Sequence, residues 1–139
     1  MEVNRRGDLG EVAFLHKAMS LGFTVAKPYG HVHRYDFIVE AGPNLWRVQV
    51  KACTNQMNGL YHVCNRRRTN SISLAYSESE LDFLVAYIIP EESWFVVPTQ
   101  RVAGHRSLLF RPKGFQGRDP YAHYREAWHL FTEPDGIVF

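Results

Sequence analysis

The sequence predicts an α/β domain with a mixed central β-sheet flanked by helices. Its 139 residues suffice for one domain and leave little room for a second, so residues 1–139 are expected to form a single unit. Hydrophobic residues make up 45% of the chain and charged residues only 22%, which favours a packed core and excludes a disordered chain. The expected elements run from a helix through several strands to a second helix, an order typical of a layered α/β fold.

The first expected element is a helix that starts at a capping Asn4 or Asp8 and runs to about Leu21. Gly22 follows at the position where a glycine commonly ends a helix. Glu11 lies on the same face of this helix as the apolar Phe14. A carboxylate there is costly unless it reaches water or meets a cation, so Glu11 has either an ordinary ion pair or a functional role.

A β-hairpin is the next expected feature, after a short strand at residues 23–26. Residues 34–40 and 45–52 read as its two strands, and the Ala-Gly-Pro-Asn sequence at 41–44 reads as its turn. The second of these strands alternates cleanly, with tryptophan and valines on one face. Its other face carries the polar side chains Arg47, Gln49 and Lys51.

The rest of the chain is expected to complete the sheet and cover it. Residues 61–64 are a possible strand, and residues 81–89 form an apolar run typical of a buried strand. Residues 94–97 are expected to return as a shorter strand. A short helix is expected within residues 99–110, and a C-terminal helix over residues 121–131, where aromatic side chains recur at helical spacing.

Four polar residues are candidates for one site. Asp36 falls inside an expected strand, where aspartate is disfavoured. Gln49 and Lys51 share a strand face, and pairing across the turn brings Asp36 opposite residues 49 to 51. The turn leaves the register open, and a solvated polar face explains each residue taken alone. Together, and with Glu11 approaching from a helix packed on that face, they suit metal-assisted hydrolysis of a phosphodiester.

These residues carry a resemblance that spans most of the chain. The supporting sequences are Gly10-Glu11, Arg34-Tyr35-Asp36-Phe37, Val48-Gln49-Val50-Lys51, Asp82-Phe83, Trp94-Phe95-Val96-Val97-Pro98 and Tyr124-Arg125-Glu126-Ala127-Trp128. In this order and spacing, the chain resembles the PD-(D/E)xK nuclease superfamily. It is most similar to the group that contains the group I intron-encoded homing endonucleases and their uncharacterised bacterial relatives. The resemblance implies a restriction-endonuclease-like core of α-β-β-β-α-β type.

The resemblance also implies an activity, a cofactor and a set of site residues. The chain would be a metal-dependent, homing- or restriction-like DNA endonuclease that hydrolyses phosphodiester bonds. Glu11, Asp36 and Gln49 would hold Mg²⁺, for which Mn²⁺ could substitute, and Lys51 would lie at the phosphate as the fourth catalytic residue. The chain departs from the pattern at Tyr35, where proline is usual, and at Gln49, which replaces an acidic residue.

Two rival functions remain open. Because Gln49 is uncharged, the chain could be a catalytically degenerate nucleic-acid-binding module on the same fold. A Holliday-junction-resolvase-like enzyme is the third reading. In each case the expected partner is DNA, double-stranded for a homing or restriction-like enzyme, and a homo-oligomer is expected, a dimer or tetramer, because cutting both strands usually requires two active sites.

Candidate DNA contacts lie after the hairpin. Three consecutive arginines suit backbone phosphates, and nearby amide side chains suit base edges, although both are also common on ordinary solvated loops. These candidates are Arg66, Arg67, Arg68, Asn55 and Gln56. A net charge of +2 adds nothing to this argument. The sequence shows no signal peptide, no membrane span and no disulfide framework, so an intracellular, cytoplasmic protein without membrane contact is expected.

Overall fold

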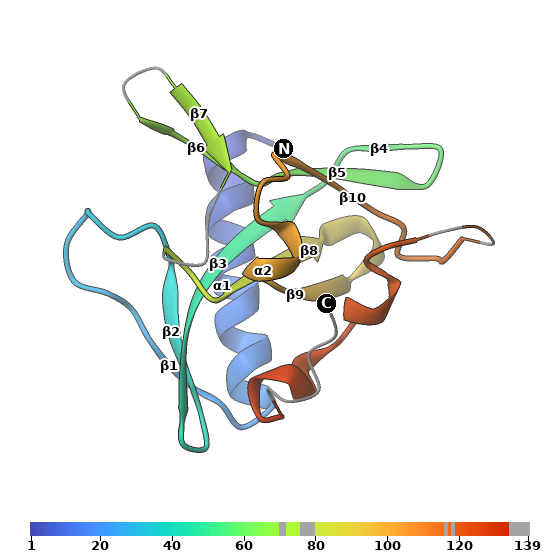
Figure 1. Ribbon diagram of the computed structural model, residues 1–139. Coiled ribbons are helices and arrows are strands. Elements are labelled where there is room, and N and C mark those ends of the chain that lie inside the picture. The colour runs from blue at the N-terminus through green and yellow to red at the C-terminus, as the bar shows by residue number, and fades with distance from the viewer. Residues whose placement is uncertain (70–71, 76–79, 116, 118, 134–139) are drawn as a thin grey trace.

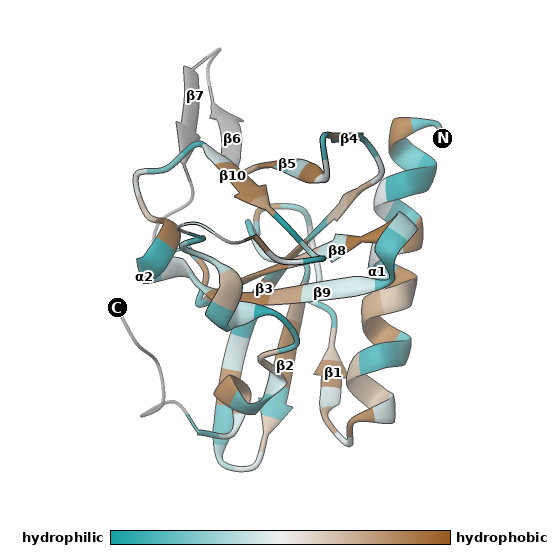
Figure 2. Ribbon diagram, turned by 90° about the vertical axis from the view of Figure 1, so that its right-hand side faces the viewer, coloured by the Kyte–Doolittle hydropathy of each residue, from teal (hydrophilic) through white to brown (hydrophobic). Residues whose placement is uncertain are grey.

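A five-stranded mixed sheet forms the centre of the computed structural model, with helix α1 (Val3–Ser20) on one face and helix α2 (Thr99–Val102) on the other (Figures 1 and 2). The structure describes residues 1–69, 72–75, 80–115, 117 and 119–133, and for 66–69 and 72–75 it describes the backbone alone. The expected α/β architecture with a mixed sheet is therefore confirmed.

Helix α1 begins earlier than the sequence predicted. Glu2, rather than Asn4 or Asp8, is its N-cap, and the Glu2 carboxylate accepts hydrogen bonds from the backbone N–H groups of Asn4 and Arg5. An acidic side chain here satisfies two N–H groups that the helix leaves unpaired. The C-terminal end agrees with the prediction, since Gly22 adopts a φ of 91° and its N–H bonds to the Met19 carbonyl.

The strand order of the central sheet is β1-β2-β3-β8-β9. Strands β3 and β8 run parallel, and all other neighbours in this sheet are antiparallel. Its strands are β1 (Thr24–Ala26), β2 (Phe37–Ala41), β3 (Asn44–Cys53), β8 (Phe83–Ile88) and β9 (Ser93–Pro98). Strands β2 and β3 form an antiparallel hairpin, and β8 adds parallel to the free side of β3. Strand β3 therefore lies in the middle of the sheet, between β2 and β8.

Two smaller sheets accompany the central one. Strand β5 lies between β10 and β4, and β6 pairs with β7 in a hairpin that projects from the body (Figure 1). These strands are β4 (Gln56–Met57), β5 (Leu60–Cys64), β6 (Arg66–Thr69), β7 (Ile72–Ala75) and β10 (Ser107–Phe110). The strand expected at 61–64 is therefore present. The short helix expected within 99–110 is α2, and the same range also contains β10.

Apolar side chains fill the space on both faces of the central sheet. On the α1 face, the Phe14 ring stacks on Phe37, with centroids 5.4 Å apart, and also contacts Trp94 and Trp128. On the other face, Phe95 of β9 packs against Phe110 of β10. The core thus has an α1 layer and a β5–β10 layer, and the central sheet that separates them carries Gln49 and Lys51 on β3.

The C-terminal helix expected over residues 121–131 is not formed. Two short 3₁₀ turns, η2 (Ala122–Tyr124) and η3 (Trp128–Phe131), occupy this range instead. A third 3₁₀ turn, η1 (Ile89–Glu91), connects β8 to β9. Glu126 has a φ of 51°, and its N–H donates to the Trp94 carbonyl. The chain pairs with the edge of β9 at this point and so cannot wind into a helix. The aromatic spacing reflected burial, which these turns also achieve.

No helix within the described residues has the length and apolar character required to cross a membrane.

Candidate active site

Asp36 lies directly before β2 and not inside it, because the strand begins at Phe37. The expected strand interior at this position was therefore wrong, but the pairing argument is confirmed. Phe37 pairs with Val48, and the Asp36 N–H donates to the Val48 carbonyl (2.8 Å), so Asp36 falls opposite Gln49. The Val50 N–H donates to Asp36 Oδ2 (2.8 Å). If β2 continued alongside β3, a backbone carbonyl of β2 would accept this hydrogen bond. Here the Asp36 carboxylate accepts it instead.

This anchoring marks the point where β2 separates from β3. Strand β3 continues to Cys53, whereas its pairing with β2 involves only residues 44–48 of β3. Lys51, two residues after Gln49, is on the same side of the strand, because side chains alternate along a strand. Asp36, Gln49 and Lys51 therefore gather at the place where β3 loses one neighbour.

Gln49 is almost completely enclosed, with 9% of its surface exposed. In the part of the chain that the structure describes, no hydrogen bond to its side-chain amide is present. The Gln49 amide atoms are not among the fully buried polar atoms that lack a hydrogen bond, so the amide still reaches solvent at the edge of the enclosed side chain. Its carbonyl oxygen is therefore suited to receive a ligand next to the Asp36 carboxylate.

Glu11 approaches from the other side of the sheet. A Cβ built on Gly10 would lie 2.8 Å from the Ala52 Cβ, so α1 packs tightly on the face of β3 that carries Ala52. The expectation that α1 covers the Gln49 and Lys51 face was therefore wrong, because odd and even residues of β3 face opposite ways. Glu11 instead lies near Asp36, beside the start of β2.

A lysine that the sequence analysis did not single out completes this side of the site. Lys27 Nζ lies 2.9 Å from Glu11 Oε1 and 5.1 Å from the centroid of the Phe37 ring. Lys27 follows β1 directly, and nothing in the local sequence pairs it with Glu11, sixteen residues earlier. Only its position before Pro28, at the end of a short strand, could have drawn attention to it.

The electrostatics link three of the four candidate residues, Glu11, Asp36 and Lys51. Burial raises the pKa of Asp36 to about 6, the hydrogen bond from Val50 opposes this shift, and the negative charge of Glu11 adds to it. The positive charge of Lys51 lowers the pKa of Asp36. Burial in turn lowers the pKa of Lys51, against the opposing effect of Asp36. Glu11 and Lys51 therefore both act on the same central carboxylate.

Two hollows border the site. One, of about 320 Å³, is lined by Lys51 together with Arg6, Cys53, His62 and Cys64. The other, of about 290 Å³, lies on the α1 side and is lined by Glu11, Lys27 and Phe37 among others. No group of three His, Cys, Asp or Glu side chains that could hold a metal occurs among the described residues. A ligand set here would have to combine two carboxylates with the Gln49 amide.

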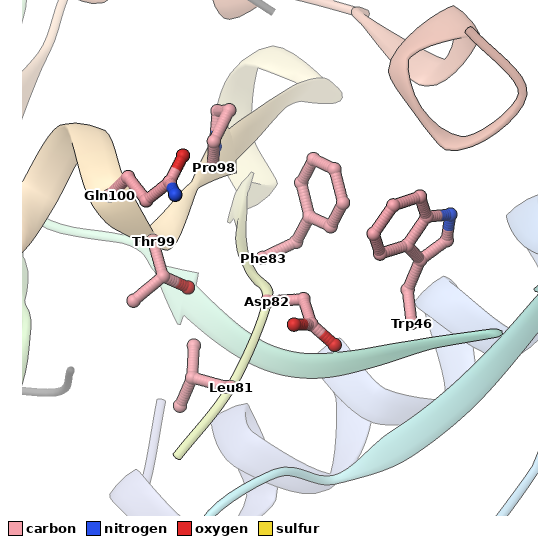
Figure 3. Close-up of a pocket in the computed structure, with 7 residues that line it drawn as sticks. All are labelled: Trp46, Leu81, Asp82, Phe83, Pro98, Thr99 and Gln100. Atoms are coloured by element: carbon pink, nitrogen blue, oxygen red, sulfur yellow. The ribbon is translucent and has the colours of Figure 1, made fainter. Parts of the chain in front are cut away.

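Asp82 has a different role from the four candidates. Its carboxylate accepts hydrogen bonds from the Arg47 backbone N–H (2.8 Å) and from the Arg47 guanidinium (3.1 and 3.2 Å). It also borders a pocket of about 180 Å³ with Trp46 and Thr99, which contains none of the four candidates (Figure 3). The Asp82-Phe83 sequence thus joins the beginning of β8 to β3.

The candidate DNA contacts lie beyond the site. Asn55 and Gln56 are exposed at the start of the β4–β5 hairpin, and Gln56 Oε1 accepts a hydrogen bond from the Gly59 N–H. The Gln56 side-chain oxygen is therefore already engaged in the turn between β4 and β5. Residues 66–68 belong to the projecting strand β6 (Figure 1), and the side chains of Arg66, Arg67 and Arg68 lie outside the described part.

Comparisons with known proteins agree with this geometry. The family model described as PD-(D/E)XK endonuclease matches residues 1–131. No curated protein matches the chain. Among solved structures, the bacterial homing endonuclease I-Ssp6803I is similar, with a TM-score of 0.79 and 29% sequence identity over 96% of this chain and 93% of that one.

Proposed function

Because the chain belongs to the PD-(D/E)XK endonuclease family, we propose that it is a divalent-metal-dependent, homing- or restriction-like endonuclease that hydrolyses phosphodiester bonds in double-stranded DNA. The observation that carries this proposal is the Asp36 carboxylate. It is fixed at the point where β2 leaves β3, next to the enclosed Gln49 amide and within the electrostatic reach of Glu11 and Lys51.

The residues present fit a hard divalent cation. Mg²⁺ takes oxygen ligands and is commonly held by one or two carboxylates together with water and substrate phosphate. Glu11 and Asp36 supply two carboxylates, and the Gln49 amide supplies a neutral oxygen. Burial raises the pKa of Asp36, so its ionised form lacks sufficient stabilisation in the protein alone, and a bound cation would provide it. Mn²⁺ has the same ligand preference.

The protein groups then divide the work of the reaction. A bound divalent cation would polarise the phosphate and make a coordinated water more acidic. Asp36 is held in place by its hydrogen bonds to the β3 backbone, and Gln49 presents its amide from β3 itself. Lys51 places a largely desolvated ammonium beside Asp36, where it would stabilise negative charge on the phosphate as the bond breaks. Desolvation strengthens this interaction, because little water screens the charge.

The rest of the predicted contacts follow from the same proposal. The β6–β7 hairpin projects from the body, so Arg66, Arg67 and Arg68 are proposed to contact backbone phosphates. Asn55, between β3 and β4, and Gln56, at the start of β4, are exposed and are proposed to contact DNA. Two strands must be cut by chains with one site each, so a homo-oligomer, a dimer or tetramer, is proposed as the active form.

Two alternative functions remain, and Gln49 supports the first of them. A site with one carboxylate fewer than the family pattern would bind metal more weakly, and the domain could then bind DNA without cutting it. A Holliday-junction-resolvase-like activity would instead show as a preference for four-way junctions over linear duplex.

A cleavage assay separates these functions. The full chain and Lys51→Ala are incubated with supercoiled plasmid, long genomic DNA and a four-way junction, with Mg²⁺, Mn²⁺ or EDTA. We expect metal-dependent cutting of duplex DNA that falls by about 100- to 1000-fold in Lys51→Ala, whereas circular dichroism and DNA binding stay unchanged. Cutting by Lys51→Ala at the wild-type rate would show that Lys51 is not a catalytic residue. Binding without any cutting would favour the alternative module.

A further inference from the structure

An exposed lysine holds one of the candidate metal ligands from the α1 side of the site. The pairing of β1 with β2 places Ala26 opposite Ile38, so Lys27, the next residue, falls opposite Phe37. Phe37 is in turn the neighbour of Asp36. The backbone register of the edge strand therefore places Lys27 at the end of the site that carries Asp36.

Lys27 contacts the Glu11 carboxylate and lies within the electrostatic reach of Asp36. Its Nζ lies 2.9 Å from Glu11 Oε1, with 67% of the lysine side chain and 32% of the Glu11 side chain exposed. The hydrogen bond to Glu11 raises the pKa of Lys27, and the charges of Glu11 and Asp36 act in the same direction. The ammonium also lies over the Phe37 ring, which holds it near the start of β2. One cation of the protein thus occupies the space that faces Glu11 and Asp36.

We propose that Lys27 is an internal counter-ion of the metal site. It pairs with the Glu11 carboxylate in the metal-free protein, has to give up that carboxylate when a divalent cation binds, and so sets the cation concentration at which the site fills. This inference rests on the proposed function, because it assumes that Glu11 and Asp36 are metal ligands.

The size of the expected effect follows from the exposure of the pair. Exposed ion pairs contribute little free energy, so Lys27 lowers the affinity of the site for a cation without preventing cation binding. Removing its charge is expected to strengthen divalent-cation binding by about two- to five-fold. Salt screens exposed charges, so this difference should shrink as ionic strength rises. A purely structural lysine, which only fastens β1 to α1, would affect thermal stability and leave cation affinity unchanged.

The test is a calorimetric titration of Mn²⁺ into the metal-free full chain at low and high salt. It compares the wild type with Lys27→Gln, Lys27→Arg and Asp36→Asn. Lys113→Gln is the matched control, because Lys113 also forms an exposed ion pair, with Glu91 at 3.7 Å, and that carboxylate is not part of the site. Thermal unfolding of each variant shows whether it is folded.

The expected result is tighter Mn²⁺ binding by Lys27→Gln at low salt, a smaller difference at high salt, and wild-type binding by Lys27→Arg and Lys113→Gln. Equal affinities of folded Lys27→Gln and the wild type would overturn the inference, provided that Asp36→Asn binds weakly. A wild type that binds no Mn²⁺, or that binds it as well as Asp36→Asn does, would instead overturn the proposed metal site. The two failures are therefore distinguishable.

Discussion

The two sides of Asp36 solve the problem of charge in different ways. On the α1 side, Glu11 and Lys27 form a charged pair in which the lysine is largely open to water and the glutamate is partly exposed. On the sheet side, Gln49 is enclosed and uncharged, and Lys51 is the only ionised group that β3 contributes beside Asp36. Enclosing a further carboxylate beside Asp36 would leave negative charges without compensation in the metal-free protein. A neutral amide on the enclosed side and a paired carboxylate on the open side avoid that cost.

The sheet side also depends on a fixed backbone, whereas the α1 side depends on one close contact. Asp36 is tied to the β3 backbone by two hydrogen bonds at 2.8 Å, one through its own N–H and one through its carboxylate. Glu11 depends on the approach of α1 to β3, which is as close as the absence of a side chain at Gly10 permits. The position of the central ligand is therefore set by strand pairing, and that of the outer ligand by helix packing.

The largest expected effect tests the enclosed side through Asp36→Asn. Because burial raises the folded pKa of Asp36 to about 6, the native state binds this proton more tightly than the unfolded chain does. Its contribution to stability is full below pH 4 and is lost as pH rises towards 6. We expect the metal-free wild type to lose about 2–3 kcal/mol from this group over that interval. Asn can still accept the Val50 hydrogen bond, so Asp36→Asn should lack this loss.

Urea unfolding in EDTA between pH 4 and pH 8 measures that difference, with Asp119→Asn as a control on another carboxylate. Parallel stability curves for the wild type and Asp36→Asn would contradict the assignment of the enclosed carboxylate. Added Mn²⁺ should stabilise the wild type at pH 8 and leave Asp36→Asn unchanged.

A second prediction tests the α1 side through its packing. In Gly10→Ala, the new methyl group would meet the Ala52 Cβ at 2.8 Å, so helix and strand must move apart. We expect a destabilisation of about 1–3 kcal/mol, together with weaker metal binding because Glu11 shifts. Ala52→Gly in the same chain should restore both properties in part. The free energy of unfolding of the single and double variants forms a double-mutant cycle, and strict additivity would sink the idea of a direct contact.

The two sides also differ in how far the sequence predicts them. The hairpin that places Asp36 opposite Gln49 follows from strand alternation and a turn between two strands, and both are local signals. The register itself did not follow, because the turn allows more than one. The face covered by α1 was predicted wrongly, since helix periodicity does not say which side of the sheet a helix packs on. Lys27 was missed because its contact with Glu11 spans two elements.

The same distinction explains the C-terminal region. The buried positions there recur at helical spacing, and the structure does bury Tyr124, Ala127, Trp128 and Phe131. Yet the chain pairs with β9 through Arg125 and turns at Glu126, which has a positive φ. The helical spacing of the apolar residues therefore predicted their burial correctly. The backbone conformation, however, depended on pairing with β9, which is distant in the sequence.

The smallest expected effect concerns whether Gln49 is an adaptation or a loss. If position 49 has a neutral amide in place of a carboxylate only because this keeps the metal-free protein stable, Gln49→Glu should bind Mn²⁺ about ten-fold more tightly at pH 8. It should also unfold more easily without metal. Gln100→Glu adds the same charge at an exposed position of α2 and should change neither property. Calorimetry and urea unfolding with EDTA measure both effects. Unchanged Mn²⁺ affinity in folded Gln49→Glu would mean that residue 49 is not a ligand, and the enclosed amide would then need another explanation. Tighter binding with lower metal-free stability would show that the enclosed side of Asp36 trades metal affinity for a stable empty site.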